Sequence, residues 1–381
     1  AGEEKSIVDL PDGYGWRSEP SDKWVMNHMI HNLTPNPAEV YLTYEVRFIP
    51  DGDPAATGIH TVETKWMDVM GLRAWPVFDA IKGKGGKDKK FTYPDEAANY
   101  DGGRYPFNRW TVDRDGVLVG TVGHLHPGGL NTELKVTRSG RTVTIFRSEA
   151  KYFEPAGAVS WDVALTATPQ NWRVGVKKGD VVSVHATYDT SRASWYESMG
   201  IMPLAWEPGG TGVDPFTTAV VTRGTITHGA LKENSNHGGG PFGLPDPRRL
   251  PDGASLAHGS VKVTDYLYGQ GDLHNVGRAL RPPTIRAGQS LKFVNRDVKD
   301  NVMHTITACK APCNRETGIA YPLADANRAF DSGNLGYGPV NRTAAKNTDT
   351  WSTPKDLKAG TYAYFCRVHP FMRGSFRVKK G

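Results

Sequence analysis

The sequence predicts an all-β protein built from two β-sandwich domains. Its 381 residues include 43 glycines and 26 prolines, and its apolar stretches are short, alternating and separated by turn residues. Alternation of apolar and polar residues over about four to eight positions is the pattern of a half-buried β-strand. No sustained apolar run follows a helical period, and no repeat of fixed length is present. A chain of this length has room for two domains with separate cores.

A stretch dense in glycine, proline and polar residues divides the chain. It covers 232–257 and has no periodic apolar pattern, so we expect an interdomain linker there. The N-terminal domain then spans 1–231 and the C-terminal domain 258–381, both within the usual range for single domains. The strands expected in the first domain are Trp24–Leu33, Val40–Ile49, Gly116–Gly123, Glu133–Thr137, Thr142–Phe146, Trp172–Val176 and Val181–Tyr188. Those expected in the second are Ser260–Tyr268, Thr284–Arg286, Ser290–Asn295, Thr305–Ala308, Gly360–Phe365 and Gly374–Lys379.

Composition and charge argue against several functional classes. The net charge is +6, and the basic residues are scattered rather than interleaved with aromatic residues, so no nucleic-acid-binding surface is predicted. No apolar run approaches the roughly 20 residues of a membrane-spanning helix. The first residues have neither the basic region nor the apolar core of a signal peptide, which indicates either a mature terminus, from which such a peptide is expected to have been removed, or an engineered start.

The three cysteines divide into a close pair and a single residue. Cys309 and Cys313 lie close together in the segment CKAPC, which suits a local disulfide and therefore a secreted or periplasmic, extracellular location. The alternative is that this pair is half of a zinc site, but the sequence has no second pair to complete one. Cys366 is then left as a functional thiolate.

The segment around Cys366 has the ligand types and the spacing of a type 1 (blue) copper site. Cys366, His369 and Met372 occur at C-x2-H-x2-M between two expected strands, and His304 begins an earlier strand. One thiolate, two imidazoles and one thioether make a trigonal site with a weak axial ligand, as blue copper electron transfer requires. Three ligands on one short loop, closed by a fourth from a separate strand, hold copper in a geometry that changes little between Cu(I) and Cu(II).

The residues around these ligands resemble the cupredoxin family. PPTIRAGQSLKFVNRD, before His304, resembles plastocyanins and amicyanins, and the C-terminal AGTYAYFCRVHPFMRGSFRV resembles amicyanin most; together they cover about 258–381. The resemblance implies a Greek-key β-sandwich that carries a type 1 copper. One departure is the segment Cys309–Asp349, which is longer than a minimal cupredoxin has there. Phe365 and Arg367 flank Cys366 where multicopper oxidases place histidines, so a laccase-type copper cluster is not expected.

A second candidate metal site lies at His124 and His126 in the N-terminal domain. In a strand, residues i and i+2 point to the same face, so both imidazoles would reach one metal. The order from this H-x-H through VKKGDVVSVHATYD to Met199 resembles the C-terminal lobe of the copper type II, ascorbate-dependent monooxygenases, over about 107–205. These include the peptidylglycine α-hydroxylating enzymes. The resemblance implies a jelly-roll-like β-sandwich with a second, mononuclear copper on His124, His126 and Met199, and with Met202 as the fallback thioether.

The N-terminal domain also departs from that family. The chain lacks room for the family's second lobe, and His185 stands where the family often has a cysteine. The nearest further histidines, His28 and His31, are three residues apart and would lie on opposite faces of a regular strand. At most one of them would join the H-x-H pair without a bulge, and a structural role for each fits the sequence equally well.

Two functions are open from the sequence. In the first, the chain is an oxidoreductase whose N-terminal copper binds oxygen or another small oxidant, and the cupredoxin supplies electrons in place of the missing lobe. In the second, only the type 1 site is functional, and the chain is a non-catalytic electron carrier or copper-binding protein. Either function needs a redox partner protein or a small-molecule reductant. In a homo-oligomer, the C-terminal copper of one subunit would also be able to serve the N-terminal site of another.

Overall fold

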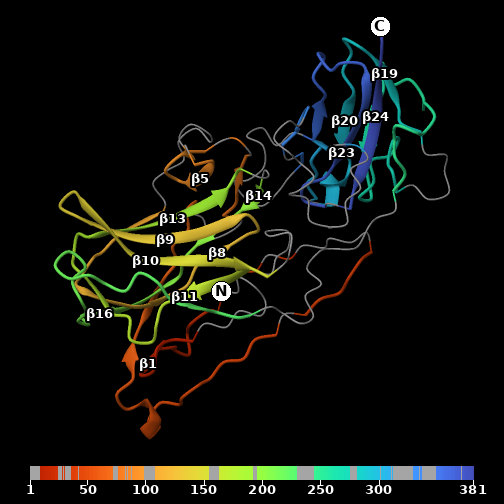
Figure 1. The fold of residues 1–381 in the computed structure, drawn as a ribbon. Helices are drawn as coiled ribbons and strands as arrows, with labels where there is room; N and C mark the ends of the chain where they lie inside the picture. Colours follow the sequence, from red (N-terminus) through yellow and green to blue (C-terminus); the bar gives the residue numbers. More distant parts are fainter. Residues whose placement is uncertain are drawn as a thin grey trace.

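The computed structural model describes residues 9–24, 28, 30, 36–41, 43–71, 76–81, 83, 85–86, 88–97, 108–153, 163–191, 195–229, 244–274, 281–300, 302–309, 311, 329–333, 335–336, 349–369 and 371–381. Across these residues the regular structure consists of β-strands and two short 3-10 turns, η1 (Pro54–Ala56) and η3 (Asp297–Asp300), so the all-β prediction is confirmed. The strands form an N-terminal and a C-terminal body (Figure 1). Among the described residues there is no helical segment with the length and apolar character needed to cross a bilayer.

Two sheets form the N-terminal sandwich. The larger sheet runs in the order β17 (Thr225–Ile226), β11 (Val163–Ala167), β10 (Arg141–Tyr152), β9 (Gly129–Arg138), β13 (Val181–Asp189) and β5 (Lys90–Tyr93), with β6 (Arg109–Thr111) also paired to β13. The smaller sheet has the order β12 (Val174–Val176), β7 (Gly116–Thr121), β16 (Leu204–Pro208) and β3 (Glu63–Lys65). Their inward residues form one core, because alternate positions such as Leu134 and Val136 of β9 face Leu118 and Trp206 across it.

Three short strand pairs complete the N-terminal body. They are β1 (Tyr14–Gly15) with β2 (His60–Thr61), β4 (Phe78–Ala80) with β14 (Trp195–Ser198), and β8 (His124–Leu125) with β15 (Gly200–Ile201). In Figure 1, β14 lies on the side of this body that faces the C-terminal strands. From β14 the chain continues into β15, which pairs with β8, the strand that contains His124.

The C-terminal body is a smaller sandwich. One sheet has the order β18 (Ser260–Val263), β20 (Lys292–Asn295) and β22 (Thr350–Ser352), and the other has β19 (Thr284–Arg286), β24 (Arg373–Lys379), β23 (Gly360–Phe365) and β21 (Thr307–Cys309). Val261, Phe293 and Phe376 are buried in the core between them.

Strand β23 separates the two cores. Tyr364, in the strand, and Cys366, just after it, belong to the C-terminal core, whereas Ala363 and Phe365 belong to the N-terminal core. This division follows from the period of two, because successive side chains of a strand point to opposite faces. Arg367 continues the alternation on the side of Ala363 and Phe365.

The strand predictions differ in outcome. The segments predicted at 116–123, 133–137, 142–146, 172–176 and 181–188 overlap β7, β9, β10, β12 and β13, although β7 ends at Thr121 and β12 begins only at Val174. The prediction of a strand over Val40–Ile49 is wrong for its described residues, which form no strand and expose Tyr41 by 81% and Phe48 by 73%. Alternation alone does not make a strand, since a neighbouring strand must also supply hydrogen bonds. Trp24, His28 and Ile30, the described residues of the first predicted strand, are also outside any strand.

The predicted linker is partly attached to the C-terminal body. Residues 230–243 lie outside the described part, but 244–257 run along β19 and β24. Arg377 of β24 donates hydrogen bonds from Nη2 to the carbonyl oxygens of Pro247 and Leu250, each at 2.9 Å, and forms an ion pair with Asp252. This part of the Pro-rich stretch is therefore packed against the second body.

Candidate metal centres

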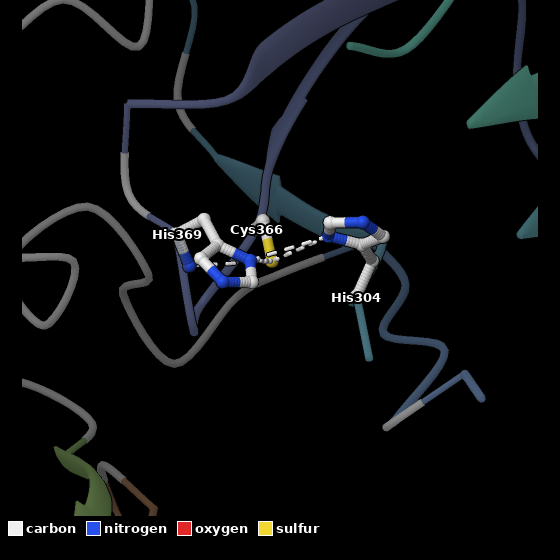
Figure 2. A group of neighbouring side chains, drawn as sticks. All are labelled: His304, Cys366 and His369. Carbon is white, nitrogen blue, oxygen red and sulfur yellow. Dashed lines mark hydrogen bonds between the residues drawn. The ribbon is translucent and has the colours of Figure 1, made fainter. Parts of the chain in front are cut away.

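The four residues of the predicted type 1 site lie at one end of the C-terminal sandwich. Among the described residues, His304, Cys366 and His369 form the one group of histidine, cysteine or acidic side chains whose ligand atoms all lie within 4.8 Å of one another. The Cys366 Sγ is 3.9 Å from His304 Nδ1 and 3.7 Å from His369 Nδ1, and the two Nδ1 atoms are 3.2 Å apart. Figure 2 shows the two imidazoles on either side of the sulfur.

Backbone hydrogen bonds fix the segments that carry these ligands. His304 exchanges two hydrogen bonds with Leu335, N–H to oxygen at 3.0 Å and oxygen from N–H at 2.8 Å. The Cys366 N–H donates to the Met372 carbonyl at 3.2 Å, and the Met372 N–H donates to the His369 carbonyl at 2.9 Å. The C-x2-H-x2-M segment is thereby closed into a compact loop, in which the fully buried Met372 lies beside Cys366 in the C-terminal core.

The surroundings of Cys366 favour a thiolate. Its sulfur accepts hydrogen bonds from the backbone N–H groups of Thr305, at 3.3 Å, and His369, at 3.4 Å. Burial by itself raises the pKa of the Cys366 thiol, but the hydrogen bonds and charges of His304 and His369 outweigh burial and hold that pKa well below its ordinary value. A buried thiolate that is stabilised before any metal arrives is the form that copper binds.

Asp297 orients the first histidine. Its Oδ2 lies 2.9 Å from His304 Nε2, and both side chains are buried. Burial raises the pKa of Asp297, but the hydrogen bonds from His304 and from the N–H groups of Tyr266 and Asp265 lower that pKa to about 2. Because the carboxylate accepts from Nε2–H, the other ring nitrogen, Nδ1, is directed at the sulfur.

An aromatic side chain covers the outer part of the site. The ring of Tyr266 packs edge-on against His304, at a centroid distance of 5.6 Å, and against His369, at 4.9 Å. Tyr266 has a φ of 59°, a left-handed backbone conformation that is uncommon for a residue with a bulky side chain. His369 is half-buried while His304 is fully buried, so His369 is the imidazole nearer to solvent.

The H-x-H pair is brought together as the strand period predicts. The rings of His124 and His126 lie 5.0 Å apart in an edge-on arrangement. The His126 Nδ1 is 2.5 Å from the carbonyl oxygen of Glu197, a contact that fixes the orientation of this imidazole. The His124 Nδ1 is buried and has no hydrogen-bonding partner among the described residues. Burial lowers the pKa of His124 to about 4, so this imidazole is neutral near pH 7 and able to bind a metal.

Tyr188 connects His126 to Met199. The antiparallel register pairs Gly200 with Leu125, and one further step along it places Met199 opposite His126. There the buried Tyr188 hydroxyl accepts hydrogen bonds from the N–H groups of His126, at 3.1 Å, and Met199, at 3.0 Å, and donates to the Met199 carbonyl at 2.6 Å. Burial raises the pKa of Tyr188, so the hydroxyl stays protonated and able to donate.

The remaining predicted ligands have other surroundings. Met202 lies in the large N-terminal core, whereas Met199 is buried outside that cluster. His28 is exposed, and His31 lies outside the described residues. In the cysteine pair, Cys309 ends β21 and Cys313 lies outside the described residues, so the disulfide stays a prediction.

Both ring nitrogens of His185 have partners within the protein. Its Nδ1 is 2.7 Å from Asp95 Oδ1, and its Nε2 is 3.1 Å from the Ser183 hydroxyl. Both ring nitrogens are therefore engaged, which is typical of a structural histidine.

Sequence reasoning missed the residues that support these ligands. Asp297 stands seven residues before His304, and a carboxylate that close to a predicted ligand is a signal that would have found it. Glu197 and Tyr188 gave no such signal, because they reach His126 only through strand pairing. Burial raises the pKa of Glu197 to about 8; Arg367 opposes this rise, and the charges of Asp79 and Cys366 add to it.

Comparisons with known proteins give distant similarities. No protein-family model matches the chain, and no curated protein matches it. The solved structures that are similar include the Cu(I) form of an amicyanin mutant, with 20% identity over 36% of this chain and 91% of that one and a TM-score of 0.20. A purple cupredoxin from Nitrosopumilus maritimus has 19% identity over 33% of this chain and 100% of that one, with a TM-score of 0.20. A copper-containing nitrite reductase from Thermus scotoductus SA-01 has 14% identity over 71% of this chain and 59% of that one, also with a TM-score of 0.20. Because these identities and TM-scores are low, the similarities carry no argument about the chemistry of this chain.

Proposed function

We propose that this chain is an extracytoplasmic copper redox protein with a type 1 copper on His304, Cys366, His369 and Met372. The observation that carries the proposal is the convergence of a buried sulfur and two Nδ1 atoms, with His304 already oriented by Asp297. The donors fit copper, because a thiolate, two imidazoles and a thioether are the soft and borderline ligands of blue copper sites. Copper bound there would supply reversible one-electron chemistry, and the hydrogen-bonded loop would limit rearrangement of the ligands during it.

A second, mononuclear copper at His124, His126 and Met199 completes the proposal. Two observations support it: the buried His124 Nδ1 has no hydrogen-bonding partner among the described residues, and the His126 ring is oriented by a backbone carbonyl, as the imidazoles of metal sites commonly are. An imidazole pair with a thioether suits copper. The resemblance to the ascorbate-dependent monooxygenases suggests oxygen as the small molecule that this centre activates, with electrons supplied from the C-terminal centre.

The alternative is a non-catalytic electron carrier in which only the type 1 site binds copper. It is favoured by one observation: within the described residues, no third histidine, cysteine or carboxylate joins His124 and His126 in a ligand cluster. Under this alternative, the N-terminal sandwich would hold or dock the cupredoxin, and the histidine pair would be structural.

Copper content and spectroscopy test both centres. Protein reconstituted with Cu(II) should hold two coppers per chain and show an intense absorption at about 600 nm from the Cys366 thiolate. The EPR spectrum should contain one blue signal and one signal with the wide hyperfine splitting of an imidazole-rich site. His126→Ala should remove the second signal and leave the blue one. One blue copper per chain would support the carrier, and the absence of a blue copper would contradict the whole proposal.

The thioether ligand is tested with a matched pair of variants. Met199→Leu and Met202→Leu both replace a buried methionine by an apolar residue of similar volume, a change that cores usually tolerate. Met199→Leu should change the EPR signal of the second copper and abolish oxygen consumption with ascorbate as reductant. Met202→Leu should leave both unchanged. Equal effects of the two variants would refute the assignment of Met199.

A further inference from the structure

Arg367, the residue after the thiolate ligand, points toward the N-terminal body. Its side chain is 7% exposed, and its Nη1 lies 2.7 Å from the Oδ2 of Asp79 in β4. Its own N–H donates to the Thr305 hydroxyl at 2.9 Å, which holds the backbone next to Cys366 in place. The guanidinium therefore links the loop of the C-terminal centre directly to a strand of the N-terminal sandwich.

Asp79 also contacts β14. Its Oδ2 accepts a hydrogen bond from Arg367, and its other oxygen, Oδ1, accepts one from the backbone N–H of Glu197 at 3.3 Å. Glu197 has a φ of 53° and lies where the pairing of β14 with β4 is irregular, between Trp195 and Ser198. This irregular backbone lets the N–H of Glu197 reach Asp79 while its carbonyl oxygen reaches the His126 Nδ1, 2.5 Å away.

We propose that Arg367, Asp79 and the backbone of Glu197 form the route by which an electron passes between Cys366 and His126 within one chain. The route is contiguous: covalent bonds from Cys366 into the Arg367 side chain, an ion pair to Asp79, and two hydrogen bonds through Glu197 to a metal-binding imidazole. This inference rests on the proposed function, since it requires copper at both centres. With copper bound at both centres, one electron would move: the copper at Cys366 would be oxidised from Cu(I) to Cu(II), the copper at His126 would be reduced from Cu(II) to Cu(I), and no proton would change place.

The Arg367–Asp79 contact lies beside a second contact between the two bodies. Ala363 and Phe365 pack into the N-terminal core on the side of β23 toward which Arg367 points. The Arg367 side chain is 7% exposed and that of Asp79 31%, so this charged hydrogen bond is partly shielded from solvent and is less screened by salt than a fully exposed pair. All contacts of this connection lie within one chain, so transfer along it does not require a neighbouring subunit.

The test uses the full chain loaded with copper at both sites. A pulse of a one-electron radical reductant bleaches the blue absorption, which should then recover in a first-order phase as the electron reaches the second copper. Asp79→Ala and Arg367→Met should each slow this recovery at least about tenfold, a change equal to about 1.4 kcal/mol of activation free energy. Asp79→Asn, which preserves the volume of the side chain, serves if Asp79→Ala does not fold. Asp331→Asn is the matched control, because Asp331 approaches the same guanidinium, 3.6 Å from Nη2, but lies within the C-terminal body.

Each outcome separates the route from the proposed function. The route is supported if recovery is slow in the Asp79 and Arg367 variants and Asp331→Asn behaves like the wild type. The slow variants must also keep both coppers, the blue EPR signal and its reduction potential. Two coppers per chain with unchanged recovery in those variants overturns the route and leaves the proposed function intact. Equal slowing in Asp331→Asn also overturns the route, because loss of any contact to the Arg367 guanidinium would then be enough to slow the recovery. One blue copper per chain in the wild type removes the route and the second centre and leaves the electron carrier as the function.

Discussion

The Tyr188 hydroxyl offers a sharp test of the second centre, because it makes three hydrogen bonds in a buried position. Tyr188→Phe deletes one oxygen and leaves three polar groups without that partner: the N–H of His126 and the N–H and carbonyl of Met199. At about 1 kcal/mol for each hydrogen bond, the loss is about 3 kcal/mol, before any added penalty for buried groups left unsatisfied. For a body of this size, that corresponds to a fall in the melting temperature of roughly 6–12 °C.

Tyr364→Phe is the matched control. Tyr364 is also fully buried, but its hydroxyl has no hydrogen-bonding partner among the described residues, so its removal should be neutral or stabilising. Thermal unfolding of the copper-free variants measures both stabilities, and copper titration measures the affinity of the second site. If Tyr188→Phe melts within the error of Tyr364→Phe and binds the second copper normally, the proposed bridge between His126 and Met199 is wrong.

Two further predictions concern carboxylates with cationic or imidazole partners. Asp297→Ala should weaken copper binding at the C-terminal site by roughly 10- to 100-fold, because His304 loses the acceptor that orients it. Competition with a copper chelator measures this affinity. An unchanged affinity would contradict the orienting role of Asp297. In Glu133, burial raises the pKa, but Arg147 and Lys135 outweigh it and lower that pKa, so the ionised form stabilises the fold above the unfolded pKa of 4.5. This stabilisation is lost as the pH falls below that value. When the free energy of unfolding in urea is measured against pH, Glu133→Gln should therefore reduce its fall at acid pH. The reduction should be at most about 1 kcal/mol, since Arg147 is half-exposed and screened by solvent. Identical acid limbs in the two proteins would exclude the pair as a contributor.

Local patterns were enough to predict that the candidate ligands of the C-terminal centre lie close together. The C-x2-H-x2-M spacing puts three of these residues on one loop, so their proximity hardly depends on the rest of the fold. The i, i+2 spacing of His124 and His126 likewise predicts two imidazoles on one face, and their ring separation of 5.0 Å agrees with it.

Strand pairing was harder to predict. Val40–Ile49 alternates as a strand does, but its described residues meet no neighbouring strand and remain exposed. The latter part of the predicted linker, 244–257, is rich in proline and glycine, yet Arg377 holds it against β24. In both cases the composition describes the segment alone, whereas its structure depends on which partner strand or side chain is close enough to bond it.

The sequence by itself determined the all-β class and predicted the clustering of His304, Cys366 and His369 and the closeness of the histidine pair, because these depend mainly on residue type and on local spacing. The tertiary structure alone decided how Asp79, Glu197 and Arg367 meet. These residues are far apart along the chain, and no local rule relates them. They come together because β4 pairs with β14, and because one face of β23 packs on the N-terminal core, which carries Arg367 to Asp79.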